Sequence, residues 1–338
     1  MLDVLGYIYR EIVKARNALY RSGVFEVHDL GAPTISVGNI TTGGTGKTPL
    51  VAYIAKLLID RGEKVCILTR GYGREAPKRR VLVSDGVEVL ETDPRKTGDE
   101  PLELANKLGG EAIIIADADR VAAADWANRK FDVTTFVLDD GFQHRKAKRD
   151  VDIVCIDATR PLSEMRMLPA GHFREPLSAL SRASAIVITR ADLVSDEAIL
   201  NLRSEISNIA GRLPVYDASN TIVGLRGINV RPQGAQISGE SFFAFCGLGN
   251  PESFFEGLRS HGLDVKGIRA FPDHYQYSQK DIVALETEAA AAECSTLVTT
   301  AKDAVKLSEL AFTVPCKVAE VETKIDDAVG FEKLIIQQ

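Results

Sequence analysis

The sequence lacks the features that mark several common protein classes. It contains no run of about 18 apolar residues, so we expect no membrane-spanning helix. Charged residues within the first 21 positions interrupt any apolar core of a signal peptide, and we therefore expect a protein that stays in the cytoplasm. The five histidines show no His-x-x-x-His spacing, which disfavours a zinc site, and no Gly-x-Ser-x-Gly segment indicates a serine hydrolase.

Cysteine pairs and net positive charge are absent as well. The five cysteines form no Cys-x-x-Cys pair, so buried reduced thiols are expected rather than disulfides, and this favours a reducing compartment. The formal net charge is −6, whereas a general nucleic-acid binder is usually basic, so no nucleic-acid partner is expected. With 338 residues, of which 45% are hydrophobic and 26% charged, the chain has the balance of a globular protein with room for two domains.

The strongest feature present is the segment Gly43-Gly44-Thr45-Gly46-Lys47-Thr48, which lies between an expected strand and an expected helix. Glycines allow successive backbone amides to turn toward phosphate oxygens, and the helix N-terminus adds its positive dipole end. Lys47 would reach the β- and γ-phosphates of a nucleoside triphosphate, and the Thr48 hydroxyl would bind magnesium. The usual motif has glycine where this chain has Thr41, and a chance glycine-rich turn is the alternative. The expected nucleotide-binding residues are Thr42, Gly43, Gly44, Thr45, Gly46, Lys47, Thr48 and Pro49.

Two aspartates, Asp139 and Asp140, follow the apolar run Thr135–Leu138, as in a Walker-B segment. One carboxylate would hold magnesium directly or through water, and its neighbour would orient water or adjust the local charge. The sequence leaves open which of the two binds the metal. Aspartate pairs also occur in ordinary turns, but a turn does not require the continuation Gly141-Phe142-Gln143-His144.

Short apolar runs alternate with longer helical segments from residue 34 onwards. Strands of this kind are buried on both faces, so the pattern predicts an α/β fold with a P-loop NTPase-like, mainly parallel sheet covered by helices. A change in composition after residue 218 predicts a second, smaller α/β domain joined by a β-ribbon linker. The expected units are an N-terminal helix (1–22), a P-loop domain (23–218), the linker (219–240) and a C-terminal domain (241–338).

Other polar residues lie at the predicted strand ends. Arg70 and Tyr72 belong to a segment whose cations and glycines would approach a phosphate. Asp99 precedes a helix, where catalysis and a helix N-cap fit the local sequence equally well. Arg174 and Glu175 would form an anion clamp beside a metal ligand, or an ordinary solvated pair. The remaining candidates are Arg120, His144 and His274.

The first segment, residues 2–21, has apolar residues at helical spacing among arginines, lysines and tyrosines. Such a helix can lie in a membrane interface, with its aromatic rings at headgroup depth and its cations near anionic lipid. It can also pack on the flank of a domain, and the residues by themselves favour that interpretation.

Taken together, the motifs resemble those of the tetraacyldisaccharide 4′-kinase family, the lipid A 4′-kinases. The resemblance includes Thr41, which is part of that family's pattern, and the block Asp139–His144 is its most specific piece. At His172-Phe173 the chain departs from the family, which more often has Pro and Leu there. Matching segments cover nearly the whole chain in order: Val37–Pro49, Thr69–Arg74, Gly98–Pro101, Asp139–His144, Ala170–Pro176, Phe271–Tyr275 and Thr299–Lys306.

The resemblance implies transfer of the γ-phosphate of ATP to the 4′-hydroxyl of a tetraacylated glucosamine disaccharide 1-phosphate, with Mg²⁺ as cofactor. It also implies a peripheral enzyme on the cytoplasmic face of the inner membrane of a Gram-negative bacterium, docked through its first helix, and we expect a monomer. Asp99 is the implied general base, and His274 would assist it from the second domain. The expected catalytic residues are Lys47, Asp99, Asp139, Asp140 and His274; the expected metal ligands are Thr48, Asp139 and Glu175; the expected substrate-binding residues are Arg70, Tyr72, Arg120, His144 and Arg174.

Two other functions fit parts of the sequence. A P-loop GTPase or metallochaperone-type ATPase would explain the paired-glycine loop, and Thr300-Ala301-Lys302-Asp303 loosely matches a guanine-reading Asn-Lys-x-Asp. Position 300 is Thr, however, and the block Asp139–His144 has no place in that class. A membrane-associated scaffold whose nucleotide site is only a switch is the second alternative, and it would phosphorylate no acceptor.

Overall fold

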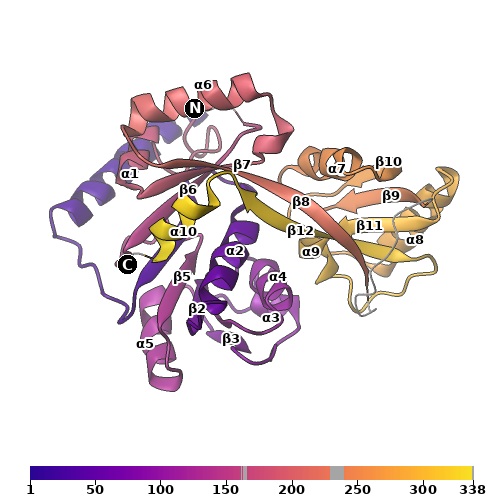
Figure 1. Ribbon diagram of the computed structural model, residues 1–338, viewed down its shortest axis with the longest axis horizontal. Coiled ribbons are helices and arrows are strands. Elements are labelled where there is room, and N and C mark those ends of the chain that lie inside the picture. Colours follow the sequence, from indigo (N-terminus) through magenta and orange to yellow (C-terminus); the bar gives the residue numbers. More distant parts are fainter. Residues whose placement is uncertain (161, 163–165, 229–239, 337–338) are drawn as a thin grey trace.

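The computed structural model describes residues 1–160, 162, 166–228 and 240–336. Twelve strands form one sheet in the order β10-β9-β11-β12-β8-β7-β6-β1-β5-β2-β4-β3. Figure 1 shows a larger N-terminal lobe and a smaller C-terminal lobe, with this sheet passing from one to the other. The expected α/β fold with a mainly parallel sheet is confirmed.

The N-terminal lobe contains the strands that the apolar runs predicted. β1, β2, β4, β5, β6 and β7 pair in parallel, and every residue of these six strands is buried, because helices cover both faces. β3 adds an antiparallel edge beside β4. The strands are β1 (Thr34–Asn39), β2 (Val65–Thr69), β3 (Val81–Asp85), β4 (Ile113–Ala116), β5 (Thr135–Asp139), β6 (Val151–Asp157) and β7 (Ala185–Thr189).

Helices pack against this sheet with their apolar faces. Leu50, Val51 and Ile54 of α2 are fully buried against Ile35 of β1 and its neighbours in the largest core cluster. Because apolar burial is the main favourable term in folding, this contact fixes the start of α2 at the end of β1. The helices are α2 (Lys47–Ile59), α3 (Pro94–Thr97), α4 (Asp99–Lys107), α5 (Arg120–Lys130), α6 (Asp196–Ala210), and the 3₁₀ turns η2 (Leu177–Arg182) and η3 (Ala191–Leu193).

Two long strands, β8 (Val215–Gly227) and β12 (Cys316–Ile325), connect the lobes as an antiparallel ribbon. β8 pairs in parallel with β7 of the N-terminal lobe, and β12 pairs in parallel with β11 of the C-terminal lobe. The ribbon is seen crossing between the lobes in Figure 1. The expected linker, 219–240, includes residues 229–239, which lie outside the described part of the chain.

The C-terminal lobe is a small α/β unit with its own core. β9 lies between β10 and β11, and all three are parallel. Phe245, Leu285 and Leu297 are fully buried together in this lobe. Its elements are β9 (Ser241–Cys246), α7 (Pro251–Ser260), β10 (Asp264–Ala270), α8 (Gln279–Ala291), β11 (Thr296–Thr300) and α9 (Ala301–Ala304).

The last helix, α10 (Ala328–Ile336), does not stay with the C-terminal lobe. After β12 the chain returns to the N-terminal lobe, where Phe331 and Ile335 are buried in the same core cluster as Ile35. The Phe331 ring lies 5.2 Å from the ring of Tyr216 at the start of β8. The end of the chain therefore anchors the base of the ribbon.

The cysteines are all buried and free of disulfides, as the sequence predicted. Burial raises the pKa of the Cys155 thiol to about 12, so this sulfur is an inert apolar side chain at neutral pH. Across residues 1–160, 162, 166–228 and 240–336, the structure has no helix with the length and hydropathy of a membrane span.

Candidate functional site

The glycine-rich loop between β1 and α2 has the geometry of a phosphate cradle. Gly43 and Gly46 have positive φ angles of 91° and 73°, which glycine adopts without strain. The loop is tied to the sheet at both ends of Thr45: its hydroxyl accepts a hydrogen bond of 2.8 Å from the Asn39 amide, and its carbonyl accepts one of 2.9 Å from the Thr189 hydroxyl. Lys47 is the first residue of α2, so the loop leads directly into the N-terminus of the helix, which is the positive end of its dipole.

Lys47, Asp140 and Arg174 form one charged group at the mouth of the loop. The Lys47 ammonium lies 3.4 Å from Asp140 Oδ1, and Arg174 binds both Asp140 oxygens at 2.8 and 3.0 Å. Burial raises the pKa of the Asp140 carboxyl, but Lys47 and Arg174 outweigh burial and hold this pKa well below its usual range. Arg174 also donates to the Thr41 carbonyl at 2.7 Å. Arg174 is thus a clamp on the loop rather than a solvated surface residue.

Asp139, at the end of β5, is almost completely buried. One carboxylate oxygen accepts a hydrogen bond of 3.1 Å from the Thr69 hydroxyl, and Oδ1 has no hydrogen-bond partner among the described residues. Burial, reinforced by the charges of Glu100 and Asp140, raises the pKa of Asp139 to about 7. An unpaired buried carboxylate oxygen beside a phosphate cradle is suited to a hard divalent cation, and such a cation would restore its ionised form.

Glu175 is not available as the metal ligand that was expected. Its side chain is completely buried, and Arg182 binds its two oxygens at 2.8 and 2.9 Å. Asn17 of α1 (Leu2–Arg21) donates to Oε2 at 2.9 Å, and the Arg16 guanidinium lies 3.6 Å from Oε1. Glu175 therefore anchors α1 to the lobe. Within the described residues, no group of three or more His, Cys, Asp or Glu side chains could hold a metal ion.

Arg120 and His144 are two buried or half-buried polar residues near the end of β5, and Arg120 holds the backbone of Asp139. The Arg120 side chain donates to the backbone carbonyls of Asp117 and Asp139 at 3.2 and 3.3 Å, and burial lowers its pKa to about 10. Burial, together with the charges of Arg120 and Arg149, lowers the pKa of His144 to about 4, so its imidazole is neutral at pH 7. The buried Nε2 of His144 and Nε of Arg120 lack hydrogen-bond partners in the described part of the chain.

Asp99 and His274 meet across the gap between the lobes. His274 Nδ1 lies 3.1 Å from Asp99 Oδ2, although the two residues come from opposite lobes. Asp99 is the first residue of α4 and is 4% exposed, and the N-cap position belongs to Gly98, so Asp99 is not the N-cap. The buried ammonium of Lys306 lies 3.7 Å from the same Asp99 oxygen.

Lys302 determines which nitrogen of His274 carries the proton. Its Nζ lies 3.4 Å from His274 Nε2 and 2.8 Å from Asp273 Oδ1. An ammonium group can only donate, so Nε2 accepts in this contact and the proton resides on Nδ1, which donates to Asp99. His274 therefore presents the lone pair of Nε2 away from Asp99.

Arg70 and Tyr72 lie on the surface beside this pair. The Tyr72 ring is 5.2 Å from the His274 ring and remains 64% exposed. Arg70 is also exposed. Tyr72 therefore leaves part of its ring open to solvent next to the His274 imidazole.

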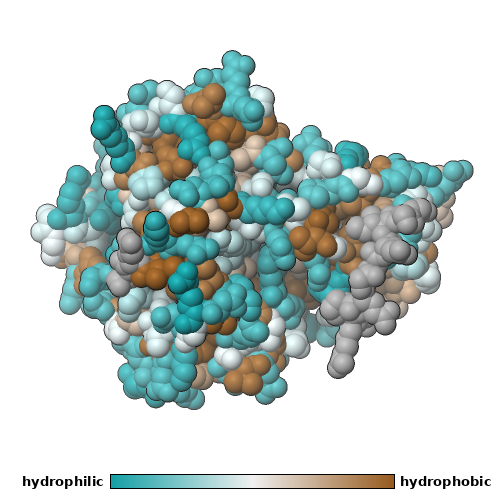
Figure 2. Space-filling view, viewed as in Figure 1, coloured by the Kyte–Doolittle hydropathy of each residue, from teal (hydrophilic) through white to brown (hydrophobic). Residues whose placement is uncertain are grey.

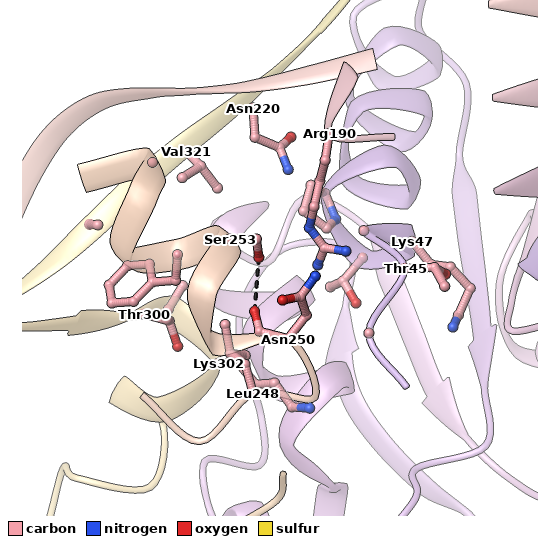
Figure 3. Close-up of a pocket in the computed structure, with 18 of the residues that line it drawn as sticks. Thr45, Lys47, Arg190, Asn220, Leu248, Asn250, Ser253, Thr300, Lys302 and Val321 are labelled. Atoms are coloured by element: carbon pink, nitrogen blue, oxygen red, sulfur yellow. Dashed lines mark hydrogen bonds between the residues drawn. The ribbon is translucent and has the colours of Figure 1, made fainter. Parts of the chain in front are cut away.

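A cavity of about 190 Å³ lies between the lobes, directly over the loop (Figure 3). One side is formed by Gly44–Pro49, and the other by residues of the ribbon and the C-terminal lobe. The sequence did not assign the second side to a nucleotide cavity because those residues are far from the loop in the chain. They are Asn220, Ile222, Leu248, Gly249, Asn250, Ser253, Phe254, Gly257, Thr300, Ala301, Lys302, Ala319 and Val321, and the N-terminal lobe adds Glu100, Glu103, Arg190, Asp192 and Leu193.

The segment Thr300–Asp303 does not have the arrangement of a guanine reader. The Asp303 carboxylate is completely buried and accepts hydrogen bonds from the Gly247 amide at 2.9 Å and the Thr300 hydroxyl at 2.8 Å. Lys306 lies 2.9 Å from its other oxygen. Asp303 therefore holds together the turns of the C-terminal lobe and has no free edge for a base.

Comparison with known proteins identifies the family. A model of the family described as "Tetraacyldisaccharide-1-P 4'-kinase" (LpxK) matches residues 1–338. The chain belongs to this family. It is 38% identical over 321 residues to the tetraacyldisaccharide 4′-kinase of Halothermothrix orenii, covering 91% of this chain and 83% of the relative. It is 35% identical over 336 residues to that of Desulfotalea psychrophila, covering 98% and 94%.

A solved structure of the family has the same fold. The crystal structure of LpxK from Aquifex aeolicus in complex with ATP aligns with a TM-score of 0.77 and 32% identity, over 98% of this chain and 96% of that one. The resemblance inferred from the motifs is therefore confirmed. The chain is a lipid A biosynthesis kinase, a phosphotransferase that acts on the 4′-hydroxyl of a tetraacyldisaccharide 1-phosphate. The GTPase and metallochaperone alternative is not favoured.

Proposed function

We propose that the chain transfers the γ-phosphate of ATP to this 4′-hydroxyl by direct displacement between the two lobes. The observation that carries the proposal is the Asp99–His274 contact at 3.1 Å beside a cradle that ends in Lys47. The ATP held by the Aquifex aeolicus relative supports ATP as the donor. The triphosphate would lie over the amides of residues 42–48, with Lys47 on the β- and γ-phosphates.

Thr48 and Asp139 are the proposed ligands of Mg²⁺. The unpaired Oδ1 of Asp139 fits this role, and Thr48 is at the start of α2 beside the cradle. Glu175 is left out because its oxygens are held by Arg182 and Asn17. When bound, Mg²⁺ would neutralise charge on the phosphate oxygens. Asp140 stays bound to Arg174 and Lys47 and keeps both cations in place.

His274 is the proposed proton acceptor, with Asp99 as its positioning residue. The family resemblance implied Asp99 as the base, but this carboxylate is 4% exposed and faces His274 and Lys306. The His274 side chain is 25% exposed against 6% for that of Asp99, and its Nε2 lone pair points away from Asp99 toward Lys302, so Nε2 is the nitrogen that can accept a proton. Asp99 accepts the hydrogen bond from Nδ1–H and stabilises the imidazolium that forms.

The substrate would bind where the exposed Arg70 and Tyr72 flank His274, with Arg174, Arg120 and His144 shaping the floor beneath. Cations near this floor would attract the substrate's phosphate. The ribbon of β8 and β12 would allow the lobes to close over ATP and substrate and exclude water, so residues 23–218 and 241–338 would act as two units apart from α10.

The first helix is the proposed membrane-docking element on the cytoplasmic face of the inner membrane, in a monomeric enzyme of a Gram-negative bacterium. Only Gly6 and Val13 of α1 are buried, whereas Ile8 and Ile12 are 49% and 61% exposed. Tyr9 and Asn17 face the lobe and hold the helix to it through Arg174 and Glu175. Apolar side chains facing outward beside arginines and lysines suit a lipid interface. Figure 2 shows another face, where hydrophilic residues predominate and apolar ones form scattered patches.

Incubation of the protein with labelled ATP, Mg²⁺ and the disaccharide precursor tests the proposal. We expect label on the lipid, abolished by Lys47→Ala, and no comparable transfer from GTP. Slow hydrolysis with no labelled lipid would instead support a nucleotide switch on a scaffold. Efficient competition by GTP for the ATP site would instead support the GTPase alternative.

A further inference from the structure

Lys302 is a charged side chain in the cavity to which the proposed mechanism gives no phosphate-binding role. It comes from α9 of the C-terminal lobe, and its side chain is 12% exposed. Its ammonium bridges Asp273 at 2.8 Å and His274 Nε2 at 3.4 Å. Lys302 therefore covers His274 Nε2, which is the proposed acceptor of the substrate proton.

The same side chain also faces the phosphate cradle. Lys302 lines the cavity opposite Gly44–Thr48 (Figure 3). Its backbone is held in place because the Thr300 hydroxyl binds Asp303, whose carboxylate is fixed by the Gly247 amide. Only the flexible four-carbon side chain of Lys302 is free to move between His274 and the cradle.

The Lys302 side chain keeps its positive charge at neutral pH. Burial lowers the pKa of its ammonium, but Glu100 and Asp273 outweigh burial and raise this pKa above its usual value. Among its partners, Asp273 is a single carboxylate and His274 Nε2 is neutral, whereas a triphosphate carries several negative oxygens. A triphosphate in the cradle would therefore compete strongly for this ammonium.

We propose that Lys302 is a further catalytic residue, whose ammonium leaves His274 Nε2 for the terminal phosphates of ATP and thereby uncovers the base. The proposal rests on the proposed function. It makes proton acceptance conditional on a filled nucleotide site, and it adds a cation from the C-terminal lobe to the charge that Lys47 supplies from the N-terminal lobe.

The chemical step is balanced with this residue in place. The substrate oxygen forms a bond to the γ-phosphorus, and the bond between that phosphorus and the β,γ-bridging oxygen breaks, so ADP leaves. The hydroxyl proton goes to His274 Nε2. Nδ1 keeps its own proton, which stays hydrogen-bonded to Asp99. Lys302 transfers no proton. Its ammonium stabilises the negative charge on the phosphoryl group during the transfer.

The pH dependence of the rate reports on this arrangement. His274 faces Asp99 of α4, Lys302 of α9, Lys306 beyond α9, Asp273 in its own loop and the Tyr72 ring. Removing the ammonium nearest to Nε2 makes protonation of the imidazole easier. The acid limb of the rate profile should therefore move to higher pH when Lys302 is neutralised.

The test compares Lys302→Ala, Lys302→Gln and Lys302→Arg by steady-state kinetics with ATP and the lipid acceptor. We expect the Ala and Gln variants to lose about 100-fold in kcat/KM for ATP, with the acid limb of the rate profile moved to higher pH. Lys302→Arg keeps the positive charge. Its kcat/KM for ATP should be at least tenfold higher than that of the Ala and Gln variants, and the acid limb of its rate profile should match that of the unaltered protein. Lys280→Ala, on the exposed surface of α8, is the matched control and should stay within about twofold.

Equal loss in all three Lys302 variants, with an unmoved pH profile and a lowered melting temperature, would show a structural role and overturn the proposal. Wild-type kinetics in Lys302→Ala would also overturn it. In either case, the proposed function would still stand if Lys47→Ala and His274→Ala abolish activity. If the unaltered protein labels no lipid, the proposed function itself fails.

Discussion

His274 Nδ1 lies 3.1 Å from Asp99 Oδ2, and this hydrogen bond joins the two lobes at the mouth of the phosphate cradle. The residues are 175 positions apart in the chain, and Lys306 reaches the same Asp99 oxygen from the C-terminal lobe. The proposed proton acceptor is therefore paired with Asp99 only when the lobes are together, so the proposal links closure to catalysis.

Removing the Asp99 carboxylate should slow the chemical step. In Asp99→Ala, His274 loses the acceptor that fixes its tautomer, so we expect kcat to fall by about 100-fold or more while the KM for ATP changes little. Steady-state kinetics with ATP and the lipid acceptor measure this, and Asp99→Asn separates hydrogen bonding from charge. Turnover near the wild-type value with intact ATP binding would exclude Asp99 from proton transfer.

Asp139 should make the protein without magnesium less stable as the pH rises. The fold raises its pKa from 3.8 to about 7, so the stabilising contribution is complete below about pH 4 and is lost as the pH approaches 7. Asp139→Asn removes this dependence. We expect it to raise the free energy of unfolding at pH 8 by roughly 1–3 kcal/mol, and not at pH 4, while abolishing transfer.

Chemical denaturation at the two pH values, without divalent cation, checks this result. Addition of Mg²⁺ and ATP should stabilise the unaltered protein at pH 8 and have little effect on Asp139→Asn. An identical pH dependence in both proteins would show that Asp139 does not titrate in this range.

Glu175 should behave as a structural residue. Glu175→Ala leaves Arg182 and Arg16 without their buried partner, so we expect a loss of about 3–5 kcal/mol in unfolding free energy. The concentration of Mg²⁺ at half-maximal activity should stay unchanged in Glu175→Gln, which keeps the shape of the side chain. A large increase in that concentration would restore Glu175 as a metal ligand.

The exposed face of α1 should carry membrane binding. Ile8→Glu combined with Ile12→Glu places charge where apolar contact with lipid is proposed, and we expect binding to anionic vesicles to fall by at least about 100-fold. Both side chains are exposed, so the melting temperature should be unchanged. Co-sedimentation measures the effect, and Leu200→Glu on α6, 67% exposed, serves as the control. Undiminished binding would contradict docking through this helix.

Much of the fold and part of the site could be predicted because the signals are local. The apolar runs gave the parallel strands, and the glycines and Lys47 gave the cradle, since both depend on neighbouring residues. The sequence did not indicate the contacts of Glu175, because its partners Arg182 and Asn17 are supplied by the packing of η2 and α1. Lys302 lay in the segment Thr300–Asp303, which the sequence likened to a guanine reader, and no local signal indicated that its side chain contacts His274 in the cavity.

The sequence by itself determined the P-loop and the alternation of buried strands with helices, because turn chemistry and apolar periodicity depend on adjacent residues, and its motifs carried the family resemblance. Only the tertiary structure decided that His274 meets Asp99, that Lys302 covers Nε2, and that Phe331 returns to the first core. These contacts join distant segments, and their geometry is fixed by close packing and by the pairing of buried charges, which exist only once the chain is folded.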